Sequence, residues 1–291
     1  MRSIDSKYWM GWRPDYPDFR DYTLKTDEVK HLFAKTGILK TGEKSLPKSA
    51  DLRQWCSPVE DQGQLGSCTA NAGVGMVEYY ERKAFGKYLD ASRLFLYKVT
   101  RTLMHEKGDS GAELRSTMGA LALFGVPPEE YWVYDIKKFD DDPPTFCYAF
   151  AQNFQSLKYV RLDPADSQYD ETLNRIKVNL AAGLPSMFGF TVYSSIRQAD
   201  DDGKIPFPSK GEKIDGGHAI MAVGYDDKLK IKNESDGNLT TGAFLIRNSW
   251  GTTWGDKGYG WLPYEYLLQG LAQDWWTIID NRYIDTGIFK V

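Results

Sequence analysis

The fold of this chain is decided by the stretch Asp61-Gln62-Gly63-Gln64-Leu65-Gly66-Ser67-Cys68-Thr69-Ala70. It places one cysteine after a glycine-containing turn and before an apolar pattern with helical spacing. A thiol at a helix N-terminus faces exposed backbone N–H groups and the positive end of the helix dipole, and both stabilise the thiolate. We therefore expect the pKa of Cys68 to lie below its ordinary value of about 8.5, which makes Cys68 a candidate nucleophile.

The composition is that of an ordinary globular protein. With 291 residues and a net charge of -4, the chain can bury one large core or two lobes. It carries no basic stripe, so nucleic acid is not an expected partner. No run of about 18 apolar residues is present, so no membrane-spanning helix is expected. The first residues lack the apolar segment of a secretory signal, which makes the cytoplasm the default location and leaves export by another route open.

Residues 1–45 differ in amino-acid composition from the rest of the chain and are interpreted as an N-terminal arm. Aromatic residues are mixed with prolines between Gly11 and Tyr22. Proline removes a backbone donor and disfavours helix, so this part is expected to be extended. A short helix is expected after it, over residues 26–34.

The remaining chain changes from helical to strand-like patterns. Helices are expected over residues 68–86, 92–104, 113–124 and 169–182, and strands over residues 186–192, 218–225, 243–248 and 258–262. A helical part, residues 46–145, is thus followed by a sheet-rich part, residues 146–291. This order indicates an α+β fold with two lobes, and a cleft between lobes is where a site is expected.

The other cysteines do not suggest a disulfide framework or a metal site. Cys56 and Cys147 are most simply read as small buried hydrophobic residues, although a bond between them stays open. The histidines are isolated and no C-x-x-C motif occurs, so tetrahedral zinc is not expected. The aspartate runs at 140–142 and 200–202 lack the spacing of a calcium loop and are interpreted as solvated loops.

A cysteine nucleophile needs a base, and the chain offers His31, His105 and His218. The first two lie in the arm and in a charged loop, where exposed histidines are common. His218 begins a strand of small residues, although a histidine in such a position, taken alone, is more often structural than catalytic. The next strand ends at Asn248, whose amide oxygen could accept the imidazole N–H, and Trp250 could cover that bond from water.

Taken together, these motifs resemble papain-type cysteine peptidases. The resemblance covers about residues 46–262, and the unusual arm and tail are similar to those of bacterial members. It rests on three ordered motifs, Gln62-Gly63 with Gly66-Ser67-Cys68, Gly217-His218-Ala219, and Asn248-Ser249-Trp250-Gly251, after a family-like start at Leu46-Pro47-Lys48-Ser49-Ala50-Asp51-Leu52-Arg53. It implies a papain-like fold, with a helical N-terminal lobe, an antiparallel, barrel-like C-terminal lobe and the active-site cleft between them.

The resemblance also implies a mechanism for the hydrolysis of peptide bonds. Cys68 would attack the peptide carbonyl as a thiolate beside the imidazolium of His218, which Asn248 orients. Gln62 and the backbone N–H of Cys68 would form the oxyanion hole. No metal or organic cofactor is implied, and the expected partners are peptide or protein substrates of a monomeric enzyme.

Substrate contacts follow from the same resemblance. Counting back from Tyr134 places Gly111 and Ala112 where the family has two glycines that bind an extended substrate through backbone groups. Gly217 would offer its carbonyl on the leaving-group side, where Trp250 also lies. Met187 and Gly189 are expected as walls of a side-chain pocket.

The chain departs from the family pattern near the nucleophile. Leu65 replaces a cysteine that is normally disulfide-bonded, and Asp109 stands near the expected position of its partner. Both framework disulfides are therefore expected to be absent, which fits a reducing compartment. Thr69 replaces the aromatic residue that usually follows the nucleophile.

Two other activities and the role of the arm stay open at this point. The same triad could transfer an acyl group to an amine, or the chain could be a catalytically silent binding protein that keeps the fold. Residues 9–39 are hypothesised to act as a pro-segment that contacts the cleft. The alternative is an arm packed permanently on the back of the domain.

Overall fold

The structure, a computed structural model, describes residues 9–36, 46–156 and 158–280. Its helices are α1 (Asp27–Thr36), α2 (Cys68–Phe85), α3 (Arg93–Leu103), α4 (Leu114–Leu123), α5 (Thr145–Ala151), α6 (Tyr169–Ala181) and α7 (Tyr264–Leu268). Its strands are β1 (Trp12–Arg13), β2 (Ser49–Asp51), β3 (Ala112–Glu113), β4 (Lys158–Arg161), β5 (Ser186–Tyr193), β6 (Ile214–Lys232), β7 (Leu239–Arg247), β8 (Tyr259–Pro263) and β9 (Ala272–Asp280).

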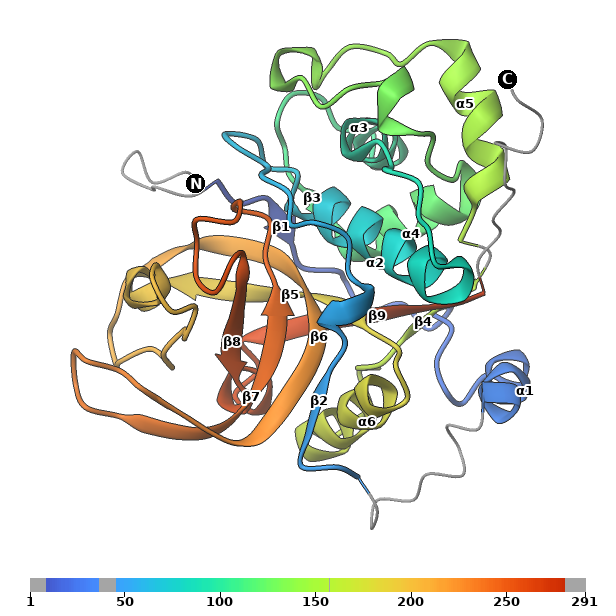
Figure 1. The fold of residues 1–291 in the computed structure, drawn as a ribbon. Helices are drawn as coiled ribbons and strands as arrows, with labels where there is room; N and C mark the ends of the chain where they lie inside the picture. The colour runs from blue at the N-terminus through green and yellow to red at the C-terminus, as the bar shows by residue number, and fades with distance from the viewer. Residues whose placement is uncertain (1–8, 37–45, 157, 281–291) are drawn as a thin grey trace.

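The elements form two lobes, which confirms the predicted α+β, papain-like architecture. Helices α2 to α5 gather in one lobe, and the other is built on an antiparallel sheet of order β4-β9-β5-β6-β7-β8 (Figure 1). Strand β2, near the start of the expected helical part, pairs instead with β6 in the sheet. The arm strand β1 lies between the lobes and pairs with β3 (Figure 1).

Helix α2 is the central helix of its lobe because its glycines let neighbours approach. A Cβ at Gly73 would lie 3.3 Å from side-chain atoms of Leu96 and Thr117, and one at Gly75 would overlap the guanidinium of Arg247. The helix ends at Gly86 in the left-handed conformation, with φ of 72°. The cost of about 1 kcal/mol for each helical glycine is therefore offset by close packing.

The other predicted elements are present, with two informative differences. The expected polar loop over residues 228–241 is shorter, because β6 continues to Lys232 and β7 begins at Leu239. Strand β9 had no period-two signal, because Trp275 and Trp276 are both buried in a strand that lies between β4 and β5. A strand buried on both faces cannot be recognised by alternation.

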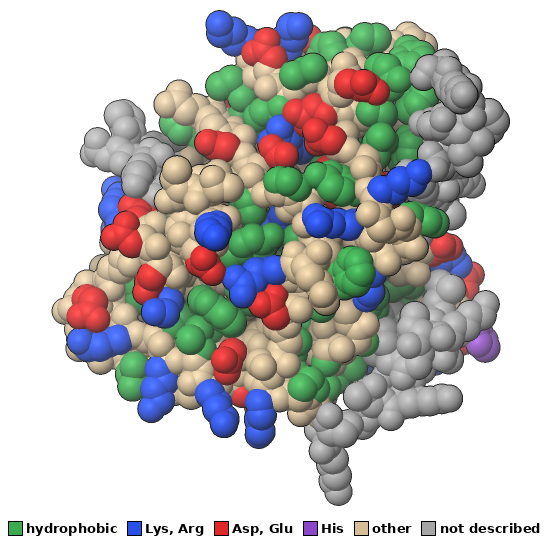
Figure 2. Space-filling model, viewed as in Figure 1, with side chains coloured by type: hydrophobic (Ala, Val, Ile, Leu, Met, Phe, Trp, Pro, Cys, Tyr) green, Lys and Arg blue, Asp and Glu red, His purple; other side chains and the backbone are tan. Residues whose placement is uncertain are grey.

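The three cysteines are free and buried, so Cys56 and Cys147 do not form the bond that the sequence left open. Figure 2 shows Lys and Arg side chains interspersed with Asp and Glu over the visible face, without a region of one sign. In the described part of the chain, no helix is long and apolar enough to cross a membrane.

Candidate active site

Cys68 is the first residue of α2, which packs against β6. Its thiol is fully buried, and the backbone N–H groups of Ala219, on β6, and of Gly11, in the arm, act to lower its pKa. The thiol therefore sits where the helical lobe, the sheet and the arm meet.

The protonation of this cysteine differs from the sequence-based expectation. Burial raises the pKa of Cys68 to about 11, although the backbone N–H groups at the helix start act in the opposite direction. The expectation of a thiolate was based on the helix N-terminus alone. It did not take into account the arm, whose Gly11 lies beside the thiol. Desolvation favours the neutral thiol and here outweighs the helix dipole.

His218 lies on β6 and is oriented by the segment that follows β7. Its Nε2 is 2.8 Å from Oδ1 of Asn248, and the indole of Trp250 stacks on the imidazole with ring centroids 4.5 Å apart and planes 19° apart. Because Oδ1 of Asn248 also accepts the backbone N–H of Ser249, it is fixed as an acceptor. Nε2 of His218 therefore carries a proton, and Nδ1 is the atom available to exchange one.

The neutral imidazole is favoured in this arrangement. Burial lowers the pKa of His218 to about 4, and the hydrogen bond with Asn248 opposes that shift. Nδ1 of His218 has no hydrogen-bond partner among the described residues. With the arm in place, the site thus holds a neutral thiol and a neutral imidazole.

Gln62 is held on the far side of the nucleophile turn. Its Oε1 accepts a hydrogen bond of 2.6 Å from the hydroxyl of Ser249, so its Nε2 is fixed as the donor. Nε2 donates to the carbonyl of Leu65 at 2.9 Å and to the carbonyl of Trp9, in the arm, at 3.1 Å. Sequence reasoning missed the orienting role of Ser249, although it lies inside the Asn248 motif.

The predicted substrate edge is covered by the arm. The backbone N–H of Ala112 donates to the carbonyl of Gly11 at 2.8 Å, and Trp12 and Arg13 pair in parallel with Ala112 and Glu113. Gly111, with φ of 71°, lies against the backbone of Gly11. The backbone groups expected to bind an extended peptide therefore bind residues of the same chain.

Trp12 packs closely against Gly189 and Gly217 of the sheet. A Cβ at Gly189 would lie within the indole ring, and one at Gly217 would lie 2.8 Å from the carbonyl oxygen of Trp12. The indole Nε1 donates to Oδ2 of Asp274 at 3.2 Å. Gly189, one of the two residues expected to line a side-chain pocket, contacts Trp12, and Met187, the other, is a buried residue of β5. Sequence reasoning missed Asp274, which the strand pattern of β9 did not reveal.

A family model for papain family cysteine proteases matches residues 46–271. The chain belongs to this family. It is therefore a cysteine-type peptidase, a hydrolase that acts on peptide substrates, and the family resemblance inferred from the three motifs is confirmed.

Two of the proteins that this chain resembles match it over more than nine-tenths of its length. An uncharacterized peptidase C1-like protein of Acanthamoeba polyphaga mimivirus is 36% identical over 92% of this chain and 86% of its own. The crystal structure of xylellain, a cysteine protease from Xylella fastidiosa, has a TM-score of 0.72 at 32% identity and covers 95% of this chain and 96% of that one. Cathepsin K of Gallus gallus is 29% identical over 73% of this chain and 58% of its own.

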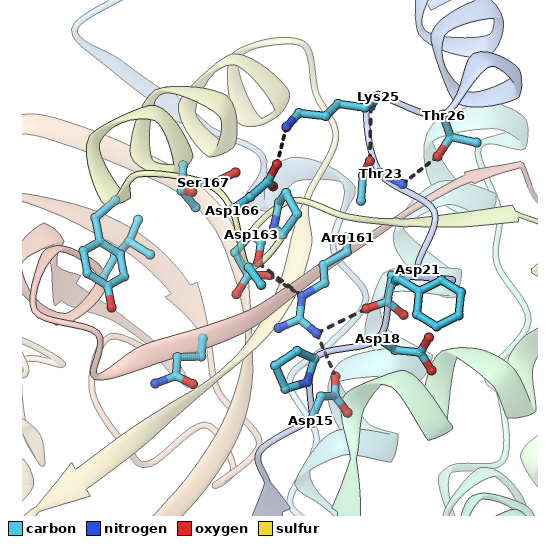
Figure 3. A pocket seen from close by; sticks show the side chains of 18 of the residues that line it. Asp15, Asp18, Asp21, Thr23, Lys25, Thr26, Arg161, Asp163, Asp166 and Ser167 are labelled. Carbon is cyan, nitrogen blue, oxygen red and sulfur yellow. Dashed lines mark hydrogen bonds and ion pairs between the residues drawn. The ribbon is translucent and has the colours of Figure 1, made fainter.

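In this papain-family member, charged groups anchor the arm beyond the cleft. Arg161, on β4, contacts Asp21 at 3.5 Å and Asp163 at 3.1 Å, and it lies 3.9 Å from Asp15 (Figure 3). It also contacts Asp274 at 2.7 Å. This group borders a cavity of about 830 Å³ between the arm and residues 161–172.

Asp15 is a buried carboxylate of this anchor. It accepts hydrogen bonds from the backbone N–H of Arg115 at 3.2 Å and from the indole of Trp276 at 3.0 Å, and its own N–H donates to Asp274 at 2.9 Å. Burial, and then the charge of Asp274, raise the pKa of Asp15. Docking of the arm thus favours the protonated form of this carboxyl.

Proposed function

We propose that the chain hydrolyses peptide bonds through Cys68, His218 and Asn248, and that residues 9–15 of the arm inhibit it by occupying the cleft. The observation that supports the catalytic part most directly is the His218 imidazole held between Asn248 and Trp250, with the residue after His218 in contact with the Cys68 thiol.

The reaction begins at the thiol. Nδ1 of His218 takes the proton of Cys68, and Sγ attacks the carbonyl carbon of the scissile bond. The carbonyl oxygen becomes an oxyanion, which Nε2 of Gln62 and the N–H of Cys68 stabilise. His218 then gives its proton to the leaving nitrogen, and the C–N bond breaks to leave an acyl-enzyme.

Water completes the cycle. His218 accepts a proton from water, the resulting hydroxide attacks the thioester carbon, and the C–S bond breaks as the thiol regains its proton. Asn248 keeps Nε2 protonated throughout, so Nδ1 remains the exchanging atom. Transfer to an amine instead of water would give an amide product, so analysis of products with an added amine separates the two activities.

The inhibitory part of the proposal rests on three backbone contacts. Nε2 of Gln62 donates to the carbonyl of Trp9, and the N–H of Ala112 donates to the carbonyl of Gly11. The backbone N–H of Gly11 also acts on the pKa of the Cys68 thiol. Nε2 of Gln62 and the N–H of Ala112 are donors that a substrate needs, so a substrate can bind them only after the arm has left the cleft.

Active-site labelling tests the nucleophile directly. An epoxide that alkylates catalytic thiols is expected to modify Cys68 slowly in the full chain, because the thiol is buried and neutral. Displacement of the arm is expected to speed the modification. Peptide mapping by mass spectrometry locates the adduct, with Cys68→Ala as the control. Unchanged labelling of that variant would falsify the assignment.

Inhibition by the arm is expected to weaken as pH rises. The undocked carboxyl of Asp15 titrates near the ordinary value of about 4, and docking raises its pKa. A raised pKa in the docked state means that docking binds a proton and is most favourable below the undocked pKa. The docked state of the arm therefore becomes less stable, relative to the undocked state, as pH increases from about 4 toward the raised pKa of Asp15.

A ratio of activities isolates this effect. Dividing the rate of the full chain by that of a Gly11→Ala chain, whose arm is displaced, cancels the titration of the free catalytic site. This ratio should increase with pH, and Asp15→Asn should flatten it, whereas Asp18→Asn, at a half-buried arm carboxylate that pairs with Arg20 of the same arm, should leave the slope unchanged. A ratio that falls with pH would contradict the assignment of the proton to Asp15.

A further inference from the structure

Asp109 connects the nucleophile turn with the substrate edge. It lies in the loop before β3, and its Oδ1 accepts the backbone N–H of Gly66 at 2.9 Å. The same oxygen accepts the hydroxyl of Tyr97 at 2.6 Å. Gly66 is two residues before Cys68, so this carboxylate holds the turn from which the catalytic helix begins.

Tyr97 extends the connection to the edge. Its hydroxyl oxygen accepts the backbone N–H of Gly111 at 3.1 Å, next to the Ala112 group that pairs with the arm. Burial, together with the charge of Asp109, raises the pKa of Tyr97, so the hydroxyl stays protonated and donates to the carboxylate. One continuous set of hydrogen bonds therefore runs from Gly66 to Gly111.

Arg101 fixes this connection to the helical lobe. Its side chain is buried, and its guanidinium lies 4.2 Å from the centroid of the Tyr97 ring. It also binds the carbonyl of Gly108, adjacent to Asp109, and contacts Asp140 at 2.8 Å. The loop that carries the carboxylate is thus held on the side away from the cleft.

We propose that Asp109 is a positioning residue, whose carboxylate and its Tyr97 partner set the spacing between the Cys68 turn and the Gly111 edge. The inference rests on the proposed function of that site. The turn also carries the Gln62 contact with Leu65, so a shift of the turn moves the thiol relative to the oxyanion donor. No disulfide stabilises this region, since all three cysteines are free.

Substitutions of Asp109 and of Tyr97 are expected to have different effects on catalysis. Loss of the carboxylate frees both the turn and Tyr97, and a misplacement of about 1 Å can cost as much as 10²-fold in rate. Loss of the Tyr97 hydroxyl leaves the bond of Asp109 to Gly66 and frees only Gly111. The first change should therefore lower kcat, whereas the second should act on KM.

The test uses the full-length chain with Gly11→Ala as the parent. Because the arm is displaced in this parent, the hydrogen bond of Trp9 with Asp109 does not affect the comparison. Asp109→Ala, Asp109→Asn and Tyr97→Phe are compared for kcat and KM on a peptide, alkylation of Cys68 by iodoacetamide and thermal unfolding. Glu130→Gln, at an exposed carboxylate of the same lobe, is the matched control.

Asp109→Ala is expected to lower kcat about tenfold and to change the rate of alkylation. Asp109→Asn should recover kcat to within about threefold of the parent, because its amide oxygen can accept both hydrogen bonds. Tyr97→Phe should raise KM several-fold, with kcat and alkylation close to those of the parent.

Parent-like kcat and KM in Asp109→Ala, or no recovery in Asp109→Asn, would overturn the proposal. If Asp109→Ala does not fold, an unchanged KM in Tyr97→Phe overturns it. A parent that alkylates at Cys68 but hydrolyses no peptide contradicts the proposed function instead, and alkylation rates of the variants then decide the positioning role.

Discussion

Cys68→Ala, made in the Gly11→Ala chain, is expected to lower kcat/KM for a peptide by about 10⁴-fold or more. The variant keeps Gln62 and the substrate edge but has no atom that can form the acyl-enzyme. Since members of such a catalytic unit act together, adding His218→Ala should cause little further loss. Initial rates of peptide hydrolysis, with the two single variants and the double variant side by side, measure both statements.

Cys147→Ala is the matched control for this prediction. Cys147 is also a free, buried cysteine, and its Sγ lies 3.6 Å from the carbonyl of Tyr131, in the helical lobe and away from the imidazole. Its replacement removes the same atom from a similar environment and should leave kcat/KM nearly unchanged. Equal losses in the two variants, at equal folded fractions by thermal unfolding, would show that stability and not chemistry is being measured.

The residues that we propose as catalytic could be selected from the sequence because each lies in a local motif. Cys68 starts a helix after a glycine turn, His218 lies on β6 and Asn248 directly follows β7, and the pairing of β6 with β7 brings the last two together. Local periodicity and turn chemistry contain that information. The two-lobe fold follows in the same way from helical spacing in the first part and strand spacing in the second.

The residues that the arm contacts could not be predicted, because they come from segments that are far apart in the sequence. Nothing in the arm itself indicates that Gly11 meets Gly66 or that Trp12 meets Gly189. Asp274 has φ of 58°, unusual for a residue other than glycine, and its carboxylate meets the indole of Trp12 only in the folded chain. Such contacts between distant segments leave no periodic signal.

The charge state of the nucleophile shows the same limit. The helix N-terminus correctly indicated backbone donors at Cys68, yet burial determines the direction of its pKa in the docked state. Desolvation depends on what covers the group, and that cover comes from Gly11 and its neighbours in the arm. A local motif therefore identifies the reactive group, whereas the fold decides when it is reactive.

Gly11→Ala is expected to raise the peptidase rate of the full-length chain by about 100-fold or more. A Cβ at this position would lie 1.9 Å from the carbonyl oxygen of Gly66, and backbone cannot move aside as a side chain can. The arm would leave the cleft, and the indole of Trp12 would lose its packing against Gly189 and Gly217. Burial of an indole contributes up to about 4–6 kcal/mol by area, and about 3 kcal/mol of that already corresponds to roughly 100-fold.

Trp12→Ala provides an independent route to the same state, because it removes the indole and its bond to Asp274 without adding a clash. Phe19→Ala is the control within the arm, since its ring is 99% exposed. Initial rates are compared at equal active-site concentration, and intact mass confirms that the arm is still attached. Gly11→Ala and Trp12→Ala should both be activated, and Phe19→Ala should have the rate of the unsubstituted chain. Equal rates in all four chains would show that residues 9–15 do not restrain the enzyme, because the clash at Gly66 and the lost indole act on docking by different means.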